Sequence, residues 1–237
     1  MESCRSGAGV AVHYGEVGVI HLFCGYDERE SIGFAVFAHS VIARASKPVA
    51  IVPLSAMGMR QGTNAFTVSR FLVPYLMGFK GRAIFVDASD MLMLGDVAEL
   101  ESYFHPRYAV QCVKHPDYET KHPRKYVGTG MESDNRNYPR KNWASVMLFN
   151  CDHPVWQDMT PERIGAYPVG ELLSLGFCGE DIGELHPEWN RLVDEGHASG
   201  RVLHWTAGIP AFKAYRDAPF SATWQSEREQ METSADE

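Results

Sequence analysis

The sequence predicts a single-domain α/β protein in which helices flank a mostly parallel, Rossmann-like central sheet. In the first half of the chain, short β-branched apolar runs alternate with longer segments whose apolar residues recur at helical spacing. The length of 237 residues suits one domain with a substantial core. Such an alternation builds a right-handed parallel sheet, whose ligands bind at the carboxyl ends of the strands.

The first half of the chain contains three expected strands and two expected helices. The strands are expected at 19–24, 49–54 and 82–88, and the helices at 31–45 and 63–77. The first helix has apolar residues at helical spacing from Ile32 to Ile42 and stops before Pro48. The order strand, helix, strand, helix, strand is the one that a parallel sheet requires.

The second half of the chain is less regular. Strands are expected at 108–113, 143–150 and 201–205, and a helix at 160–175 with Asp158 or Thr160 as its cap and Pro161 as its first residue. The polar stretch 115–142 has no clear periodicity and predicts a long loop, which is usually functional. The tails 1–17 and 221–237 are expected to be flexible, which leaves one folded domain at 18–220.

Composition narrows the function classes. The net charge of −8 argues against a generic nucleic-acid binder, although the segment 114–141 carries a net charge of +3 and is the place to expect an anionic ligand. No apolar run approaches the roughly 20 residues of a membrane span, and the N-terminus lacks a targeting signal, so a cytoplasmic location is expected. The five cysteines are widely spaced and predict neither a disulfide framework nor a zinc site.

The end of the third strand carries the most informative motif. The apolar run 83–86 delivers Asp87 and Asp90 at its polar end. Two carboxylates at a strand terminus suit Mg²⁺ or Mn²⁺, which prefer oxygen ligands and keep positions open for phosphate oxygens. A bare pair of this kind is more often a capped turn, so the surrounding sequence decides.

The run 67–100 resembles the donor-binding block of glycosyltransferase family eight and of its phage and bacterial relatives. Ser69-Arg70 occupies the Ser-Arg position of that block, and Asp87-Ala-Ser-Asp90 stands where the family has a D-x-D signature. Either Asp90 takes the metal-binding role through a shifted turn, or Ser89 contributes and Asp90 lies behind it. The resemblance implies a GT-A fold, a UDP-sugar donor that Arg70 reaches, and an address in a bacterial or phage-infected cytoplasm.

Near the C-terminus, the run 202–210 resembles the closing His-x-x-Gly motif of the same family, with one extra residue. The resemblance implies that His204 completes the metal site and that Lys213 meets the donor's diphosphate. An imidazole ligand would favour Mn²⁺ over Mg²⁺.

Three further segments resemble family motifs. The first implies that Asn142 and Ser145 bind the donor in the sugar pocket. The second implies that Glu180 and Asp181 are catalytic residues beneath the anomeric carbon. The third implies that Tyr26 and Asp27 bind the base and ribose of the donor. The acidic pair would stabilise positive charge in an oxocarbenium-like transition state, with retention of anomeric configuration implied by the family.

The basic loop that contains His115, Lys121, His122, Arg124, Lys125 and Tyr126 departs from the founding family members and resembles phage-type relatives. It is either a clamp for the acceptor or the diphosphate, or a solvated loop.

The sequence thus predicts a metal-dependent glycosyltransferase that moves a sugar from a UDP-sugar to a hydroxyl acceptor. The acceptor is a glycan or a hydroxymethylated base of phage-type DNA. Two alternatives use the same residues: a nucleotide-sugar phosphohydrolase, with water as the acceptor, and a non-catalytic module that binds sugar nucleotides without turnover. The five matching blocks favour the glycosyltransferase, although a fold by itself does not fix an activity.

Overall fold

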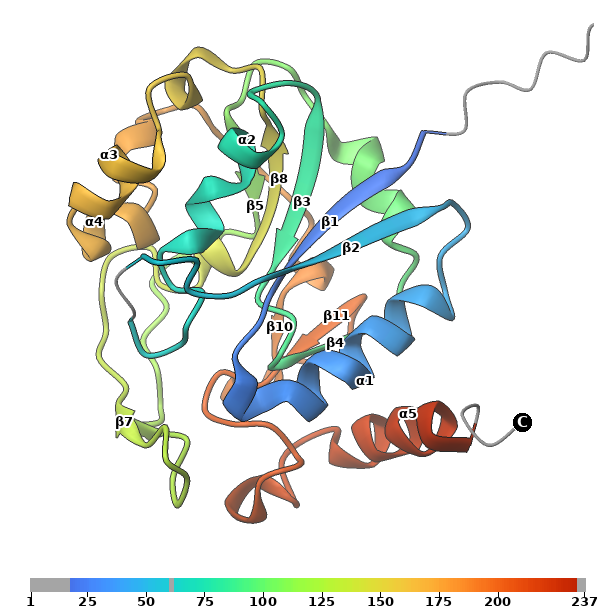
Figure 1. Ribbon diagram of the computed structural model, residues 1–237. Coiled ribbons are helices and arrows are strands. Elements are labelled where there is room, and N and C mark those ends of the chain that lie inside the picture. Colours follow the sequence, from blue (N-terminus) through green and yellow to red (C-terminus); the bar gives the residue numbers. More distant parts are fainter. Residues whose placement is uncertain (1–17, 60–61, 234–237) are drawn as a thin grey trace, which may run out of the picture.

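The computed structural model describes residues 18–59 and 62–233 and has a six-stranded sheet at its centre (Figure 1). The strands lie in the order β2 (Val49–Leu54), β1 (Ile20–Gly25), β3 (Arg82–Val86), β8 (Val146–Asn150), β5 (Val110–Cys112) and β9 (Ile182–Glu184). Only β8 runs antiparallel to its neighbours; β1 pairs parallel with β2 and β3, and β5 with β9. The predicted mostly parallel α/β sheet is confirmed.

The remaining strands form two smaller sheets. The first is β10 (Arg191–Leu192), β11 (Val202–His204) and β4 (Met91–Met93), with β11 and β4 antiparallel. The second is a short hairpin of β6 (Arg124–Lys125) and β7 (Ser133–Asp134) inside the long loop 115–142. The β4–β11 pair joins the chain after β3 to the expected last strand, and the candidate site forms at that junction.

The first expected helix is confirmed as α1 (Ser31–Ile42), but the second is much shorter than 63–77. Only a 3₁₀ turn, Ser69–Leu72, and α2 (Val73–Leu76) are helical there. The carbonyl of Asn64 accepts hydrogen bonds from both the backbone N–H and the hydroxyl of Thr67, at 3.2 and 2.8 Å. This local turn competes with a helix, as Thr and Asn side chains often do.

The expected helix at 160–175 is two helices, α3 (Pro161–Ala166) and α4 (Val169–Leu173). The predicted start is confirmed, since the Thr160 hydroxyl accepts from the backbone N–H of Arg163 and Pro161 is the first residue. The break falls at Tyr167, whose ψ of 145° is extended because a proline follows it. A single helix was expected because the helical spacing of apolar residues continues across this break.

Helices cover both faces of the sheet (Figure 1). The aromatic residues Phe85, Phe149 and Trp156 lie in the core that α2, α3 and α4 cover, and the opposite core includes Phe37 of α1. The four cysteines in the described part of the chain are buried and free.

The expected flexible tail from 221 onwards is wrong for most of its length. Residues Ser221–Thr233 form the helix α5, which lies along α1 (Figure 1). Trp224 is fully buried, and the carboxylate of Glu227 pairs with His39 and Arg44, each at 2.7 Å. The residues are polar on average, but these two buried side chains hold the helix in place. The other expected tail, 1–17, lies outside the described residues.

Within 18–59 and 62–233, no helix combines the length and the apolar character that crossing a membrane requires.

Candidate active site

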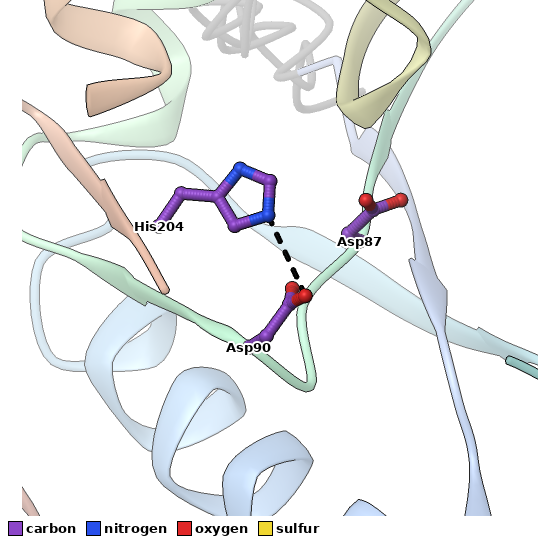
Figure 2. A group of neighbouring side chains, drawn as sticks. All are labelled: Asp87, Asp90 and His204. Carbon is purple, nitrogen blue, oxygen red and sulfur yellow. Dashed lines mark ion pairs between the residues drawn. The ribbon is translucent and has the colours of Figure 1, made fainter. Parts of the chain in front are cut away.

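The ends of three strands bring together Asp87, Asp90 and His204. Asp87 directly follows β3, Asp90 directly precedes β4, and His204 is the last residue of β11. The antiparallel register of β4 and β11 sets His204 opposite Met91, and the backbone N–H of Trp205 donates to the carbonyl of Asp90 at 2.9 Å. One ligand atom from each of the three side chains lies within 4.8 Å of the others, and all three residues are buried (Figure 2).

The turn between the two aspartates decides how they point. Ala88 has a φ of +60°, a left-handed conformation that turns the chain sharply after β3. The Ser89 hydroxyl donates to the carbonyl of Gly25 at 3.1 Å, so it faces the sheet and not the other two ligands. A Cβ atom at Gly33 of α1 would lie 2.0 Å from the Ser89 carbonyl, so glycine is required for this close approach. The structure therefore favours Asp90, through a shifted turn, over Ser89.

The imidazole of His204 is oriented from both sides. Its Nδ1 lies 2.8 Å from Oδ1 of Asn190, which can only accept, so Nδ1 carries a proton. Its Nε2 lies 3.4 Å from Oδ2 of Asp90. Burial lowers the pKa of His204, but the carboxylate of Asp90 outweighs burial and the net shift is upward. An imidazole that is fixed through its second nitrogen in this way is the usual arrangement of a metal-binding histidine.

Arg70 holds the carboxylate of Asp87. Its Nη1 lies 2.6 Å from Oδ1 of Asp87 and donates to the carbonyl of Ala144 at 2.8 Å. The guanidinium lies 5.2 Å from the ring centres of both Phe66 and Phe85, within cation–π range. Arg70 is thus a buried residue that positions the candidate metal ligand Asp87, as well as a part of the cavity wall.

The three side chains fit a divalent cation. Oδ1 of Asp90 is buried and, in the described chain, accepts no hydrogen bond, so it is free to coordinate. Burial raises the pKa of Asp87 in spite of Arg70, and the nearby Asp90 adds to the rise, because two carboxylates at this distance repel each other. Carboxylate oxygens with one imidazole are a ligand set for Mn²⁺ or Mg²⁺.

The three ligands open into a cavity of about 450 Å³, within the size range of small-molecule sites. Four cationic side chains line it beside Asp87, Asp90 and His204: Arg70, Lys125, Arg136 and Lys141. Three of these cations, Lys125, Arg136 and Lys141, come from the segment 114–141 that carries the net positive charge. A cavity with a paired-carboxylate metal site and several cations can hold a metal-bound polyphosphate.

Lys141 is held in the cavity wall by a chain of hydrogen bonds. Its Nζ donates to Oδ1 of Asn135 at 2.6 Å, Nδ2 of Asn135 donates to Oγ1 of Thr120 at 3.0 Å, and Thr120 donates to the carboxylate of Glu195. Burial, and then the charge of Lys125, lower the pKa of Lys141 to about 8. Lys141 is therefore a cation that titrates close to neutral pH.

The structure brings only some of the other expected donor-binding residues to this cavity. Asn142 and Ser145 line it, and Nδ2 of Asn142 is buried without a hydrogen-bond partner in the described chain. Tyr26 and Asp27 line a separate cavity of about 210 Å³, where Arg29 already binds both carboxylate oxygens of Asp27 at 2.8 and 2.6 Å. Lys213 is exposed and does not line the large cavity.

The expected catalytic pair lies elsewhere. Glu180 is exposed, and Asp181 precedes β9, with its carboxylate 3.9 Å from His153. Because β9 runs parallel to β5, the residues before it lie at the amino edge of the sheet, opposite the end of β3 where Asp87 stands. The placement of Glu180 and Asp181 beneath the reacting sugar is wrong.

Several cavity residues were not assigned from the sequence. They are Asn64, Thr67, Asn135, Arg136, Tyr138, Lys141 and Thr206, with Asn190 behind His204. Asn190 lies directly before β10, a strand that the sequence pattern did not predict, so no periodicity marked it. The others lie in irregular segments, where no periodicity shows which way a side chain points.

Comparison with known proteins identifies the family. No family model matches the chain. Protein CDI of Arabidopsis thaliana is 33% identical to it over 250 aligned positions, which cover 97% of this chain and 91% of the plant protein. The chain belongs to the family of protein CDI. This relative is a plant protein, whereas the motifs of the chain were expected to place it nearest to phage and bacterial proteins.

Solved structures similar to this CDI-family chain share its fold. They include the bifunctional glycosyltransferase WbbM (TM-score 0.61, 14% identity), glycosyltransferase GlyE of Streptococcus pneumoniae (0.58, 11%) and galactosyltransferase LgtC (0.56, 11%). Each match covers 89% of the present chain. The chain spans 49% of WbbM, 60% of GlyE and 96% of LgtC. The fold is therefore that of the GT-A glycosyltransferases, as expected.

Proposed function

We propose that this protein is a metal-dependent glycosyltransferase whose donor is a nucleotide-diphospho-sugar, in the first instance a UDP-sugar. The observation that carries the proposal is the convergence of Asp87, Asp90 and His204 at the rim of a cavity with four cationic side chains. Bound Mn²⁺ or Mg²⁺ would neutralise the charge that develops on a departing diphosphate. The GT-A fold places this convergence at the carboxyl end of β3, where ligands of open α/β sheets bind.

In this proposal, different residues of the chain bind the cation and the phosphates of the donor. Asp87, Asp90 and His204 hold the cation, with Arg70 and Asn190 fixing two of these ligands. Lys125, Arg136 and Lys141 face the phosphate oxygens from the loop 115–142.

The transferred sugar takes the end of the cavity at Asn142 and Ser145. Nδ2 of Asn142 is a buried donor without a partner in the described chain, which suits a sugar hydroxyl. The family resemblance implies retention of anomeric configuration, which the anomeric form of the product, read by proton NMR, would test.

Turnover of nucleotide sugars tests the proposal. We expect Mn²⁺-dependent release of UDP from at least one UDP-sugar, slowly with water and faster with an acceptor. Asp90→Asn should lower the rate by about 100-fold or more, because it removes a ligand that stabilises several kcal/mol of developing charge. The matched control is Asp158→Asn, an exposed carboxylate on the α3 side of the molecule, which should leave the rate unchanged.

Three outcomes separate the proposal from its alternatives. Cleavage of the nucleotide sugar to UMP and sugar 1-phosphate, at a rate that no acceptor accelerates, would indicate a phosphohydrolase. Binding of UDP without turnover of any nucleotide sugar would indicate a binding module. Turnover that persists undiminished in Asp90→Asn would contradict the role given to the metal site.

A further inference from the structure

A second cavity of about 420 Å³ lies beside the metal cavity and has no part in the donor site proposed above. Its lining comes from the start of the long loop and from the segment around β10: Lys114, His115, Pro116, Asp117, Tyr118, Glu119, Lys121, Pro187, Glu195 and His197. None of these residues lines the metal cavity. The volume is within the range of small-molecule sites.

The two cavities share a wall. The hydroxyl of Tyr118 donates to Oε1 of Glu195 at 2.8 Å and also interacts with Thr206, which lines the metal cavity. The same carboxylate accepts from Thr120, the start of the hydrogen-bonded chain that reaches Lys141. Tyr118 of the second cavity and Thr206 of the metal cavity are therefore in contact, so a ligand in the second cavity lies next to the proposed donor site.

Three ring side chains cluster in the second cavity. The ring of His115 lies 6.1 Å from that of Tyr118 and 5.9 Å from that of His197, centre to centre. Burial, and then the neighbouring His197, lower the pKa of His115 to about 3, and burial also lowers the pKa of His197. Both imidazoles are therefore neutral at physiological pH, and Nε2 of His115 is buried without a hydrogen-bond partner in the described chain. Neutral rings with polar edges present both apolar faces and hydrogen-bonding atoms.

The charges around these rings are mixed. Lys114 and Lys121 line the cavity together with Asp117, Glu119 and Glu195. Groups of both signs suit hydroxyl groups, each of which donates one hydrogen bond and accepts others. A polyanion such as a nucleic acid requires a cluster of cations without acidic groups among them. This mixed lining therefore favours a neutral polyol.

The segment 114–141, which includes the basic loop, does not offer a free stripe of cations to nucleic acid. Each of its seven Lys and Arg residues has a partner inside the protein: Lys114 and Arg140 lie over Trp143, Lys121 donates to Glu195, Arg124 pairs with Glu132, Lys125 lies over Tyr126, Arg136 pairs with Asp134, and Lys141 donates to Asn135. Three of these cations, Lys125, Arg136 and Lys141, line the metal cavity, and the other four each have a partner in the protein, whereas a DNA-binding surface needs clustered cations that are available to its phosphates.

We propose that the second cavity is the acceptor site and that it takes a neutral carbohydrate, so that the acceptor is a glycan and not DNA. This inference rests on the proposed function, because an acceptor site has meaning only beside a sugar donor. The rings of His115, Tyr118 and His197 would contact the faces of the acceptor sugar, and the mixed charges would bind its hydroxyls.

The test is saturation-transfer NMR on the full chain loaded with UDP and Mg²⁺. The probes are methyl glycosides of glucose, galactose, mannose, xylose and N-acetylglucosamine, together with lactose and cellobiose. We expect at least one glycoside to bind, and its binding to weaken by about tenfold in His197→Leu, which removes a ring contact. Tyr118→Phe is a milder second variant, and Tyr75→Phe, at an exposed tyrosine outside both cavities, is its matched control.

UDP binding, measured in parallel by calorimetry, separates this inference from the proposed function. If UDP binds as in the native chain but no glycoside binds, or glycoside binding is unaffected in both variants, the acceptor site is overturned and the donor site stands. If UDP does not bind at all, the proposed function fails first. A duplex with hydroxymethylated cytosine that binds at physiological salt and competes with the glycoside would overturn the choice of a neutral acceptor.

Discussion

The guanidinium of Arg70 lies 2.6 Å from the carboxylate of Asp87, and both side chains are almost closed off from solvent. Removal of the Arg70 guanidinium would leave the buried carboxylate of Asp87 without this positively charged partner. We therefore expect Arg70→Ala to lower the free energy of unfolding by about 3–5 kcal/mol and to weaken Mn²⁺ binding. The matched control is Arg82→Ala at an exposed arginine over Phe104, which should change stability by about 0.5 kcal/mol or less. Equal unfolding free energies for the two variants in urea would contradict the structural role of Arg70.

Asn190 fixes the ring of His204, since its Oδ1 accepts from Nδ1 at 2.8 Å. Without this bond the imidazole could rotate, or could carry its proton on the nitrogen that faces the metal. Asn190→Ala should weaken Mn²⁺ binding by about 10–100-fold, as for other residues that orient metal ligands. Asn190→Asp, which keeps an acceptor, should recover part of the loss. Isothermal titration of Mn²⁺ into the three proteins measures this, and equal affinities would show that Asn190 has no orienting role.

Lys141 should make donor binding depend on pH. Its pKa is lowered to about 8, first by burial and then by Lys125, so its charge is complete below that pH and is lost as the pH rises through it. If the ammonium binds the diphosphate, the affinity for UDP and Mg²⁺ should fall above pH 8 by up to about tenfold per pH unit. Lys141→Arg, which keeps its charge, should show no such fall. Calorimetry across this range decides, and the same alkaline decline in Lys141→Arg would assign the effect to another group.

The C-terminal helix should contribute to the stability of the whole domain. Trp224 of α5 is fully buried against a core that includes Trp205, whose Nε1 donates to the carbonyl of Pro219 at 2.8 Å. Trp224→Ala should lower the free energy of unfolding by about 3–5 kcal/mol, because it leaves a large cavity. The control on the same helix, Glu229→Ala, is exposed and should have little effect. Indistinguishable denaturant midpoints would show that α5 is not part of the core.

The sequence predicted those elements whose local pattern agrees with the final fold. The strands β1, β2 and β3 and the helix α1 were found because period-two or period-3.6 patterns decide between strand and helix locally. The helix expected at 63–77 is shorter because side chains of the turn at Asn64 bind the backbone. The helix α5 was missed because only Trp224 and Glu227 of its residues are buried, too few to produce an amphipathic pattern.

The candidate site was predicted in part for a similar reason. Asp87 and Asp90 flank strands and converge with His204 because strand ends meet at one edge of a sheet. Glu180 and Asp181 were misplaced because the edge on which they lie depends on the direction of β9, which no local pattern reveals. Lys141 was counted only as one charge of a basic loop, since its burial results from contacts far along the chain.

The measurement that tests the central claim most directly is a calorimetric titration of UDP with and without Mn²⁺, on the native chain and on the double variant Asp87→Asn/Asp90→Asn. The account predicts UDP binding that requires Mn²⁺ in the native chain and is abolished in the variant, with the fold intact by circular dichroism. Two results would contradict a metal-dependent donor site at Asp87, Asp90 and His204. The first is UDP binding of equal strength with and without Mn²⁺. The second is that neither UDP nor any other nucleoside diphosphate binds in either condition.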